Sequence, residues 1–308
     1  MSGVTLRTEA VKGMNEFKNY HPLVNFAYFT AVIAFAMFFM NPFCLAVSFL
    51  SGFSYSVMLG GSKALKSFLM YLVPLMLITA LINPAFSHAG ITVLGYLPSG
   101  NPLTLESVLY GIAASFMLAG VLCWFSCFNK IITSDKIMYL FGKILPSLSL
   151  IISMTLRFVP KFRQQLKEVR DAQKCIGRDL SDGKIIKKIK NSIRILSVVI
   201  TQSMENAIDT ADSMKSRGCG LPGRTAYSNY TFDNRDKAAF AVVLALTAYV
   251  FAGGIFGNFH FSFFPYIKSS EVTPYGLSFF AAYAVLCFMP VIIEIREEHR
   301  WKKLRSKI

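Results

Sequence analysis

The residues that commonly carry chemistry in proteins are few in this sequence and lie far apart. Its four histidines have no second metal ligand at the spacing that a metal site requires. They are His21, His88, His260 and His299. The six cysteines form no C-x-x-C pair and mostly stand in apolar runs, so they indicate packing rather than a disulfide framework. The sequence therefore predicts no metal site and no cofactor.

A nucleotide-binding motif is also missing from the pattern. The run Gly60-Gly61-Ser62-Lys63 resembles a phosphate-binding loop only superficially, because the G-x-x-x-x-G-K-[ST] spacing is absent. A turn next to a membrane explains these glycines better. Without a nucleotide motif the chain is not expected to hydrolyse ATP, and we predict a non-catalytic protein.

Two predicted helices end in a glycine that follows basic residues. The first ends in AQKCIGR, residues 172–178, and the second in SMKSRG, residues 213–218. Glycine just after a last turn that carries Lys or Arg is a common C-terminal signal, and the cation stabilises an exposed helix end by about 0.3–1 kcal/mol. Plain helix caps explain these residues. The same ends would also present fixed cations to a partner, where an arginine can bind a carboxylate or backbone carbonyl groups.

Three helices between residues 128 and 237 are predicted to position these ends. A short helix follows Thr133-Ser134-Asp135, a second runs from about 148 to 177, and a third runs from about 184 to 217. The third carries an apolar stripe with the 3.6-residue period of an amphipathic helix. The stripe consists of Ile189, Ile193, Leu196, Ile200, Met204, Ala207, Ala211 and Met214. Its other faces are too polar to cross lipid, so this helix should lie on the membrane face or against other helices. A solvated hairpin that only links two spans is the alternative.

The rest of the chain has the composition of an integral membrane protein. Hydrophobic residues make up 54% of the 308 residues and charged residues 16%, whereas soluble domains average about 25% charged residues. Apolar stretches close to the ~20 residues that cross a bilayer recur along the chain. They cover residues 23–40, 43–60, 67–86, 105–127, 238–257 and 275–294. The second is interrupted by Pro42 and Gly52, so a re-entrant segment is its alternative.

The net charge of +15 indicates topology rather than nucleic-acid binding. If the N-terminus is cytoplasmic, all but one of the 32 lysines and arginines lie inside, and only Lys268 lies outside. This bias predicts a multi-pass protein of the cell membrane with both termini in the cytoplasm. The lipid bilayer, with its anionic headgroups, is the expected partner, and nucleic acid is not. The spans hold almost no ionisable residue, so the chain has no visible means of using an ion gradient.

Five segments follow from this topology. They are a cytoplasmic N-terminus (1–22), transmembrane helices 1–4 (23–127), a cytoplasmic segment (128–237), transmembrane helices 5–6 (238–294) and a basic cytoplasmic tail (295–308).

Three motifs lie in the cytoplasmic segment. They are Met154-Thr155-Leu156-Arg157-Phe158-Val159-Pro160, Ala172-Gln173-Lys174-x-x-Gly177 and Ala211-Asp212-Ser213-Met214-Lys215-Ser216-Arg217-Gly218. With Thr133-Ser134-Asp135 and the order of the spans, they resemble the pattern of the transmembrane T component of energy-coupling factor (ECF) transporters. The single motifs are weak, but their order and spacing are specific, and the resemblance covers nearly the whole chain.

The resemblance implies a subunit that joins two cytoplasmic ABC ATPases to a small substrate-binding membrane protein, the S component, for uptake of a vitamin or other micronutrient. It implies an all-α membrane protein with about six transmembrane helices and a cytoplasmic coupling domain of two or three amphipathic helices that cross in an X. Each coupling helix would dock on one ATPase through its tip. The apolar stripes of both helices would face the S component.

Carried over to this sequence, the second tip is Ser216-Arg217-Gly218, with Arg217 as the docking cation. The first tip is Cys175-Ile176-Gly177, where Ile176 stands in place of the usual arginine. Arg178 or Lys174 could substitute for that arginine, or apolar contact could hold one ATPase instead.

Other functions are compatible with parts of the pattern. A T-like permease subunit of a cobalt or nickel importer belongs to the same superfamily, and only its partners would tell it apart. A membrane-embedded enzyme that modifies lipids would need convergent carboxylates or histidines at the interface, which the sequence lacks. An ordinary ABC permease and a scaffold without transport are further alternatives.

Overall fold

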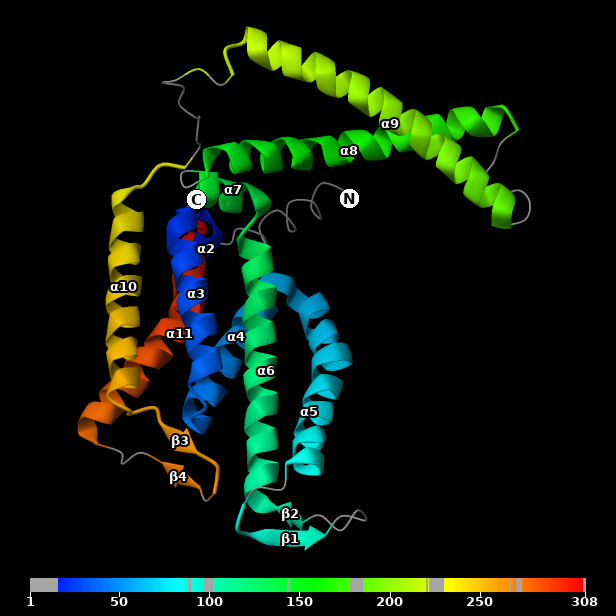
Figure 1. Ribbon diagram of the computed structural model, residues 1–308. Coiled ribbons are helices and arrows are strands. Elements are labelled where there is room, and N and C mark those ends of the chain that lie inside the picture. The colour runs from blue at the N-terminus through cyan, green and yellow to red at the C-terminus, as the bar shows by residue number, and fades with distance from the viewer. Residues whose placement is uncertain are drawn as a thin grey trace. The chain divides into compact units, whose positions relative to one another are not determined.

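The structure is a computed structural model and is almost entirely helical (Figure 1). It describes residues 16–87, 90–96, 102–142, 145–177, 185–219, 221, 230–265, 267–269 and 273–306. The chain divides into two compact units, of which the first combines residues 1–136 with 230–308 and the second is 137–229. The predicted all-α fold is confirmed.

The first unit is a bundle of apolar helices. Its helices are α2 (Glu16–Asn19), α3 (Pro22–Phe38), α4 (Pro42–Ser67), η1 (Phe68–Leu72), α5 (Val73–Phe86), α6 (Leu105–Ile131), α10 (Asn234–Ile255) and α11 (Pro274–Arg305). Two short hairpins connect them. In these, β1 (Val93–Tyr96) pairs antiparallel with β2 (Pro102–Thr104), and β3 (Phe261–Ser262) with β4 (Lys268–Ser269).

Within the residues that the structure describes, four helical segments are long and apolar enough to cross a membrane. They are Pro42–Phe86, Leu105–Ile131, Asn234–Ile255 and Pro274–Leu304. The first has 45 residues, and a straight helix of that length would measure about 68 Å, more than twice the hydrocarbon core of a bilayer. The helix Pro22–Phe38 is apolar but shorter. All six predicted apolar stretches are thus helical, and the number of membrane crossings stays a prediction.

The long apolar segment breaks at Gly61, within the run Gly60-Gly61-Ser62-Lys63 where a turn is predicted, and it is not interrupted at Pro42 or Gly52. Gly61 has φ +57° and ψ −143°, outside the helical region, and it separates two helical runs. Pro42 begins α4, where a proline costs no hydrogen bond. Gly52 remains helical, so the structure contains no re-entrant loop at this point.

The core of the first unit joins α3, α4, α6 and α11 through aromatic side chains. Trp124 is fully buried, and its Nε1 donates a hydrogen bond to the Ser48 hydroxyl at 3.1 Å. Gly52 permits this close approach, because a Cβ there would lie 3.2 Å from Trp124 Nε1. Tyr28 donates its hydroxyl proton to the Cys287 carbonyl at 3.2 Å, which ties α3 to α11.

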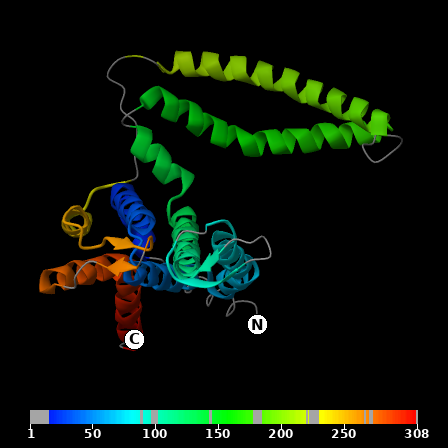
Figure 2. The same cartoon turned by 60° about the horizontal axis from the view of Figure 1, so that its bottom comes forward.

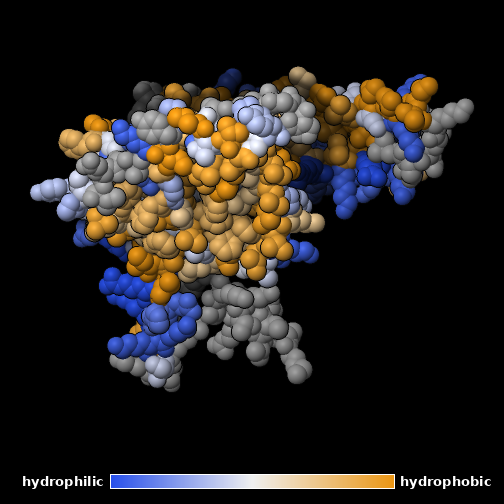
Figure 3. Space-filling model, turned by 90° about the horizontal axis from the view of Figure 1, so that it is seen from below, coloured by the Kyte–Doolittle hydropathy of each residue, from blue (hydrophilic) through white to orange (hydrophobic). Residues whose placement is uncertain are grey.

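Large apolar side chains also cover the outside of this unit. Phe38, Leu81 and Phe86 are each more than 70% exposed. Hydrophobic residues dominate the bundle when it is viewed from the side of the two hairpins (Figure 3). An apolar surface of this extent is stable in contact with lipid and unfavourable in water.

The second unit contains two long helices, α8 (Pro146–Cys175) and α9 (Ile185–Ser216), which follow α7 (Ser134–Gly142). They run antiparallel (Figures 1 and 2) and cross in the view of Figure 1. The predicted helices at 148–177 and 184–217 agree with the observed bounds to within two residues. We call α8 and α9 the helix pair.

Candidate functional site

The tip of α9 is a complete Schellman motif. The Gly218 N–H donates to the Lys215 carbonyl at 2.9 Å, and the Cys219 N–H donates to the Met214 carbonyl at 3.0 Å. Gly218 has φ +71°, a conformation that strains any residue with a Cβ. The chain therefore turns sharply after the last helical residue, and Arg217 stands exposed at the corner.

The neighbouring Ser216 closes the α9 helix. Its hydroxyl donates to the Ser213 carbonyl at 2.9 Å, and the residue is exposed. The hydroxyl thus stabilises the helix end, and the arginine beside it is exposed. Among the described residues, none forms an ion pair or a hydrogen bond with the Arg217 guanidinium.

The tip of α8 has the same backbone form. Gly177 has φ +74°, and its N–H donates to the Lys174 carbonyl at 3.0 Å. Cys175 ends the helix with an exposed side chain, and Ile176 is 65% exposed. Arg178 lies outside the described residues. The two tips therefore share a glycine-dependent turn but present an isoleucine at one and an arginine at the other.

The predicted apolar stripe of α9 lies on the outer face of the helix pair. Five of its members are between 50% and 65% exposed. They are Ile189, Ile193, Leu196, Ile200 and Met204. Ala207 and Ala211 are exposed as well, whereas Met214 is half-buried. A continuous exposed apolar face on a long helix marks a contact surface for a partner or a membrane.

A second face of α9 was missed by the sequence reasoning. Asn191, Ile195 and Val199 are all buried, at spacings of four residues. This face packs against α8, on which Gln165 is buried. These three residues recur every four positions, as a buried helix face requires. Because one of them is the polar Asn191, apolar periodicity alone does not identify this face.

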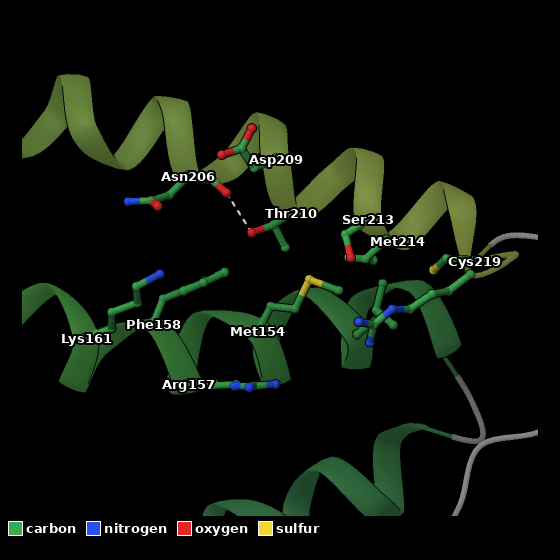
Figure 4. A pocket seen from close by; sticks show the side chains of 12 residues that line it. Met154, Arg157, Phe158, Lys161, Asn206, Asp209, Thr210, Ser213, Met214 and Cys219 are labelled. Carbon is green, nitrogen blue, oxygen red and sulfur yellow. Dashed lines mark hydrogen bonds between the residues drawn. The ribbon is translucent and has the colours of Figure 1, made fainter.

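An apolar stripe on α8, predicted from the sequence as Phe158, Phe162, Leu166, Val169 and Ile176, is only partly exposed. Phe162 and Leu166 are 40% and 45% exposed, whereas Phe158 and Val169 are half-buried. Phe158 points from α8 toward α9 (Figure 4). The outer surface of the helix pair is therefore formed mainly by α9, with a smaller contribution from α8.

A buried lysine stands directly before the second unit. Lys136 is 5% exposed, and its Nζ donates to the Lys18 carbonyl. In the amide orientation that satisfies both neighbours, Nζ also donates to Asn25 Oδ1 at 2.8 Å. Burial, and then repulsion from Lys18, lower the pKa of Lys136 to about 8. These contacts fix the end of the first unit where the chain leaves it.

The chain returns to the first unit through a second polar cluster. Asp236 accepts a hydrogen bond from the His21 N–H at 3.3 Å. The guanidinium of Arg235 forms a 3.5 Å ion pair with Glu16 and lies 4.2 Å from the centre of the Tyr20 ring. The chain thus contacts the segment before α3 both where it leaves the first unit, at Lys136, and where it returns, at Arg235 and Asp236.

Metal-binding residues do not gather in the described part of the chain. Within it, no three His, Cys, Asp or Glu side chains are placed to hold a metal ion.

Residues 14–227 match the family described as CbiQ, cobalt transport protein. The match covers more than half of the chain and includes both helix tips. The chain belongs to this family.

Curated relatives of this CbiQ family member carry a consistent name, energy-coupling factor transporter transmembrane protein EcfT. The protein of Lactococcus lactis subsp. cremoris is 36% identical over 101 residues, 32% of this chain and 38% of that relative. That of Streptococcus thermophilus is 34% identical over 105 residues, 34% of this chain and 40% of the relative. That of Bacillus selenitireducens is 34% identical over 112 residues, 36% of this chain and 42% of the relative. The match spans about two fifths of the length of each relative. The resemblance to ECF T components is confirmed.

Proposed function

We propose that this protein is the transmembrane coupling subunit of an ECF-type ABC importer in the cell membrane, with both termini in the cytoplasm. It transmits the ATP-driven motion of two separate ATPase subunits to a substrate-binding S component, and it catalyses no reaction itself. The uptake of a vitamin or another micronutrient follows from the movement of the S component. The observation that carries the proposal is a pair of long helices that end in rigid, exposed tips.

The tips are the proposed docking points for the ATPases. Arg217 would bind a carboxylate or carbonyl group on one ATPase, and a hydrogen bond to a charged group contributes about 1.5–3 kcal/mol. Ile176 would enter an apolar recess on the other. The glycine turns hold both side chains at the ends of their helices, so the side chains move with the helices.

The helix pair is the proposed lever. A helix with the 32 residues of α9 measures about 48 Å, long enough to carry a displacement across most of a small protein. When ATP binding draws the ATPases together, the tips move with them and the crossed helices shift against each other. The exposed stripe of α9 faces the S component and tilts it, so that the substrate is released inward.

The family description favours a second candidate. A CbiQ protein that serves a cobalt or nickel importer would use the same tips and helix pair with a different membrane partner. Copurification separates the two candidates, because a vitamin system yields a small S component and the metal system yields the membrane subunit of a cobalt or nickel importer.

Reversal of one charge tests the docking role. Arg217→Glu should abolish copurification of the ATPases and uptake by the assembled transporter. Arg194→Glu is the matched control, because Arg194 is exposed on the same helix but far from the tip. Circular dichroism of both variants would verify that the helices are retained. Normal copurification and normal uptake by Arg217→Glu would refute the docking role.

A further inference from the structure

A cavity of about 630 Å³ lies between the first half of α8 and the last half of α9. Three cationic side chains line it, Arg157 and Lys161 from α8 and Arg217 from the tip of α9. Among the described residues these three form no ion pair, and the lining contains one carboxylate, that of Asp209. The cavity therefore has an excess of positive charge that the helix pair itself does not neutralise.

The α8 wall of the cavity carries the apolar side chains Leu150, Met154 and Phe158, whereas the α9 wall is mostly polar. Met154 and Phe158 point from α8 toward α9, and Lys161 lies beside them on the same side of the helix (Figure 4). Met214 lines the opposite wall on α9. Methionine side chains adapt to irregular apolar ligands. The cavity thus combines three cations with an apolar wall on α8 and a mostly polar wall on α9.

We propose that this cavity binds one anionic phospholipid. The lipid phosphate contacts Arg157 and Lys161, which lie one helical turn apart on α8, and Arg217 adds to the positive charge of the lining. The glycerol backbone and upper acyl chains lie along Met154 and Phe158. This site shares Arg217 with the proposed ATPase docking, so its test changes only Arg157 and Lys161.

Two observations favour a lipid over other anions. Inorganic phosphate would use the cations but leave the apolar wall uncovered. Beyond the cavity, the N-terminal part of α8 exposes Leu148, Ile151 and Ile152, which are each more than 40% exposed. A soluble acidic peptide would leave these side chains in water, whereas a lipid with its neighbours in the bilayer covers them. In the sequence, α8 begins fifteen residues after the end of the transmembrane helix α6.

Native mass spectrometry of the full-length protein tests the site. Detergent-purified protein is incubated with either phosphatidylglycerol or phosphatidylcholine, and the bound lipid is counted. We expect one phosphatidylglycerol to be retained in preference to phosphatidylcholine. Arg157→Gln with Lys161→Gln should weaken phosphatidylglycerol binding on the order of tenfold, because two cations near the phosphate are lost.

The control variant removes the same charge from the helix pair, one cation from α8 and one from α9. Arg170→Gln with Lys188→Gln changes two exposed cations outside the cavity lining and should leave lipid retention unchanged. Circular dichroism verifies folding, and copurification of the ATPases is recorded separately, so that loss of docking is not mistaken for loss of lipid.

Four results would overturn the proposal. Equal retention of phosphatidylcholine would remove the requirement for an anion. Equal loss in the control variant would indicate general surface charge. Full displacement of the lipid by inorganic phosphate would indicate a phosphate site. Binding of an acidic peptide in place of the lipid, with the same loss in the cavity variant, would indicate a protein partner.

Discussion

The buried Lys136 gives the chain a defined dependence of stability on pH. Substitution by methionine keeps the length of the side chain and removes the charge. It also leaves the Lys18 carbonyl and the Asn25 amide oxygen without their donor, at a cost of about 1–3 kcal/mol for each buried acceptor. Removal of the buried positive charge offsets part of that cost. The free energy of unfolding of the Lys136→Met variant at neutral pH should therefore fall by less than the cost of the two lost hydrogen bonds.

The size of the change in the free energy of unfolding follows from the pKa of Lys136 in the folded and unfolded states. The folded protein releases the Lys136 proton near pH 8, whereas the unfolded chain retains it to the ordinary value of 10.5. Between these values the unfolded state binds more protons, so the free energy of unfolding rises with pH. The full difference corresponds to about 3 kcal/mol, of which about 2 kcal/mol should be gained between about pH 7 and about pH 9.5.

Denaturant titration in mixed micelles at several pH values measures this gain. The wild-type protein should become more stable as the pH rises through this range, and Lys136→Met should lack this contribution. Lys167→Met, which removes an exposed lysine of α8, should keep it. A wild-type protein whose stability is flat or falls over this range, or a Lys136→Met variant that gains as much as the wild type, would refute the assignment of a buried, destabilised ammonium.

Three further predictions concern the helix pair and the bundle. Ile193→Asp places a charge in the exposed stripe and should reduce copurification of the S component at least tenfold while ATPases are retained, whereas Ser197→Asp, an exposed polar position on α9, should not. Gly218→Val should strain the positive-φ turn by about 1 kcal/mol or more and weaken ATPase retention, and Gly218→Asn, which tolerates this conformation, should preserve it. Gly52→Leu should overpack the Trp124 contact and lower the free energy of unfolding by about 1–3 kcal/mol in a thermal or denaturant melt, while Gly95→Ala should have little effect because no atom lies within 4 Å of its added Cβ.

Local signals explain what could be predicted. The bounds of α8 and α9 follow from a 3.6-residue period and from the glycines that end both helices, and these signals act over one or two turns. The exposed stripe was predicted for the same reason, because helix periodicity alone selects its members.

Long-range packing explains what could not be predicted. Lys136 looks like any other cytoplasmic lysine in the sequence, and its burial depends on Lys18 and Asn25, more than one hundred residues earlier. The break at Gly61 agrees with the turn predicted at Gly60-Gly61, whereas the interruption predicted at Gly52 is wrong, because a helix pattern does not reveal which glycine leaves the helical region. The cavity also depends on two segments about fifty residues apart along the chain.

The two tips place different chemistry on the same backbone turn. Gly177 and Gly218 have φ values of +74° and +71°, so the geometry of the turn does not distinguish the two ends. A contact made by Arg217 weakens as salt screens its charge, whereas burial of Ile176 does not depend on salt in this way. Under the proposed function, the ATPase at the α9 tip must offer a carboxylate or carbonyl group, and the ATPase at the α8 tip must offer an apolar recess. Two identical ATPases would have to provide both, so the difference between Ile176 and Arg217 favours two ATPase subunits whose docking surfaces differ.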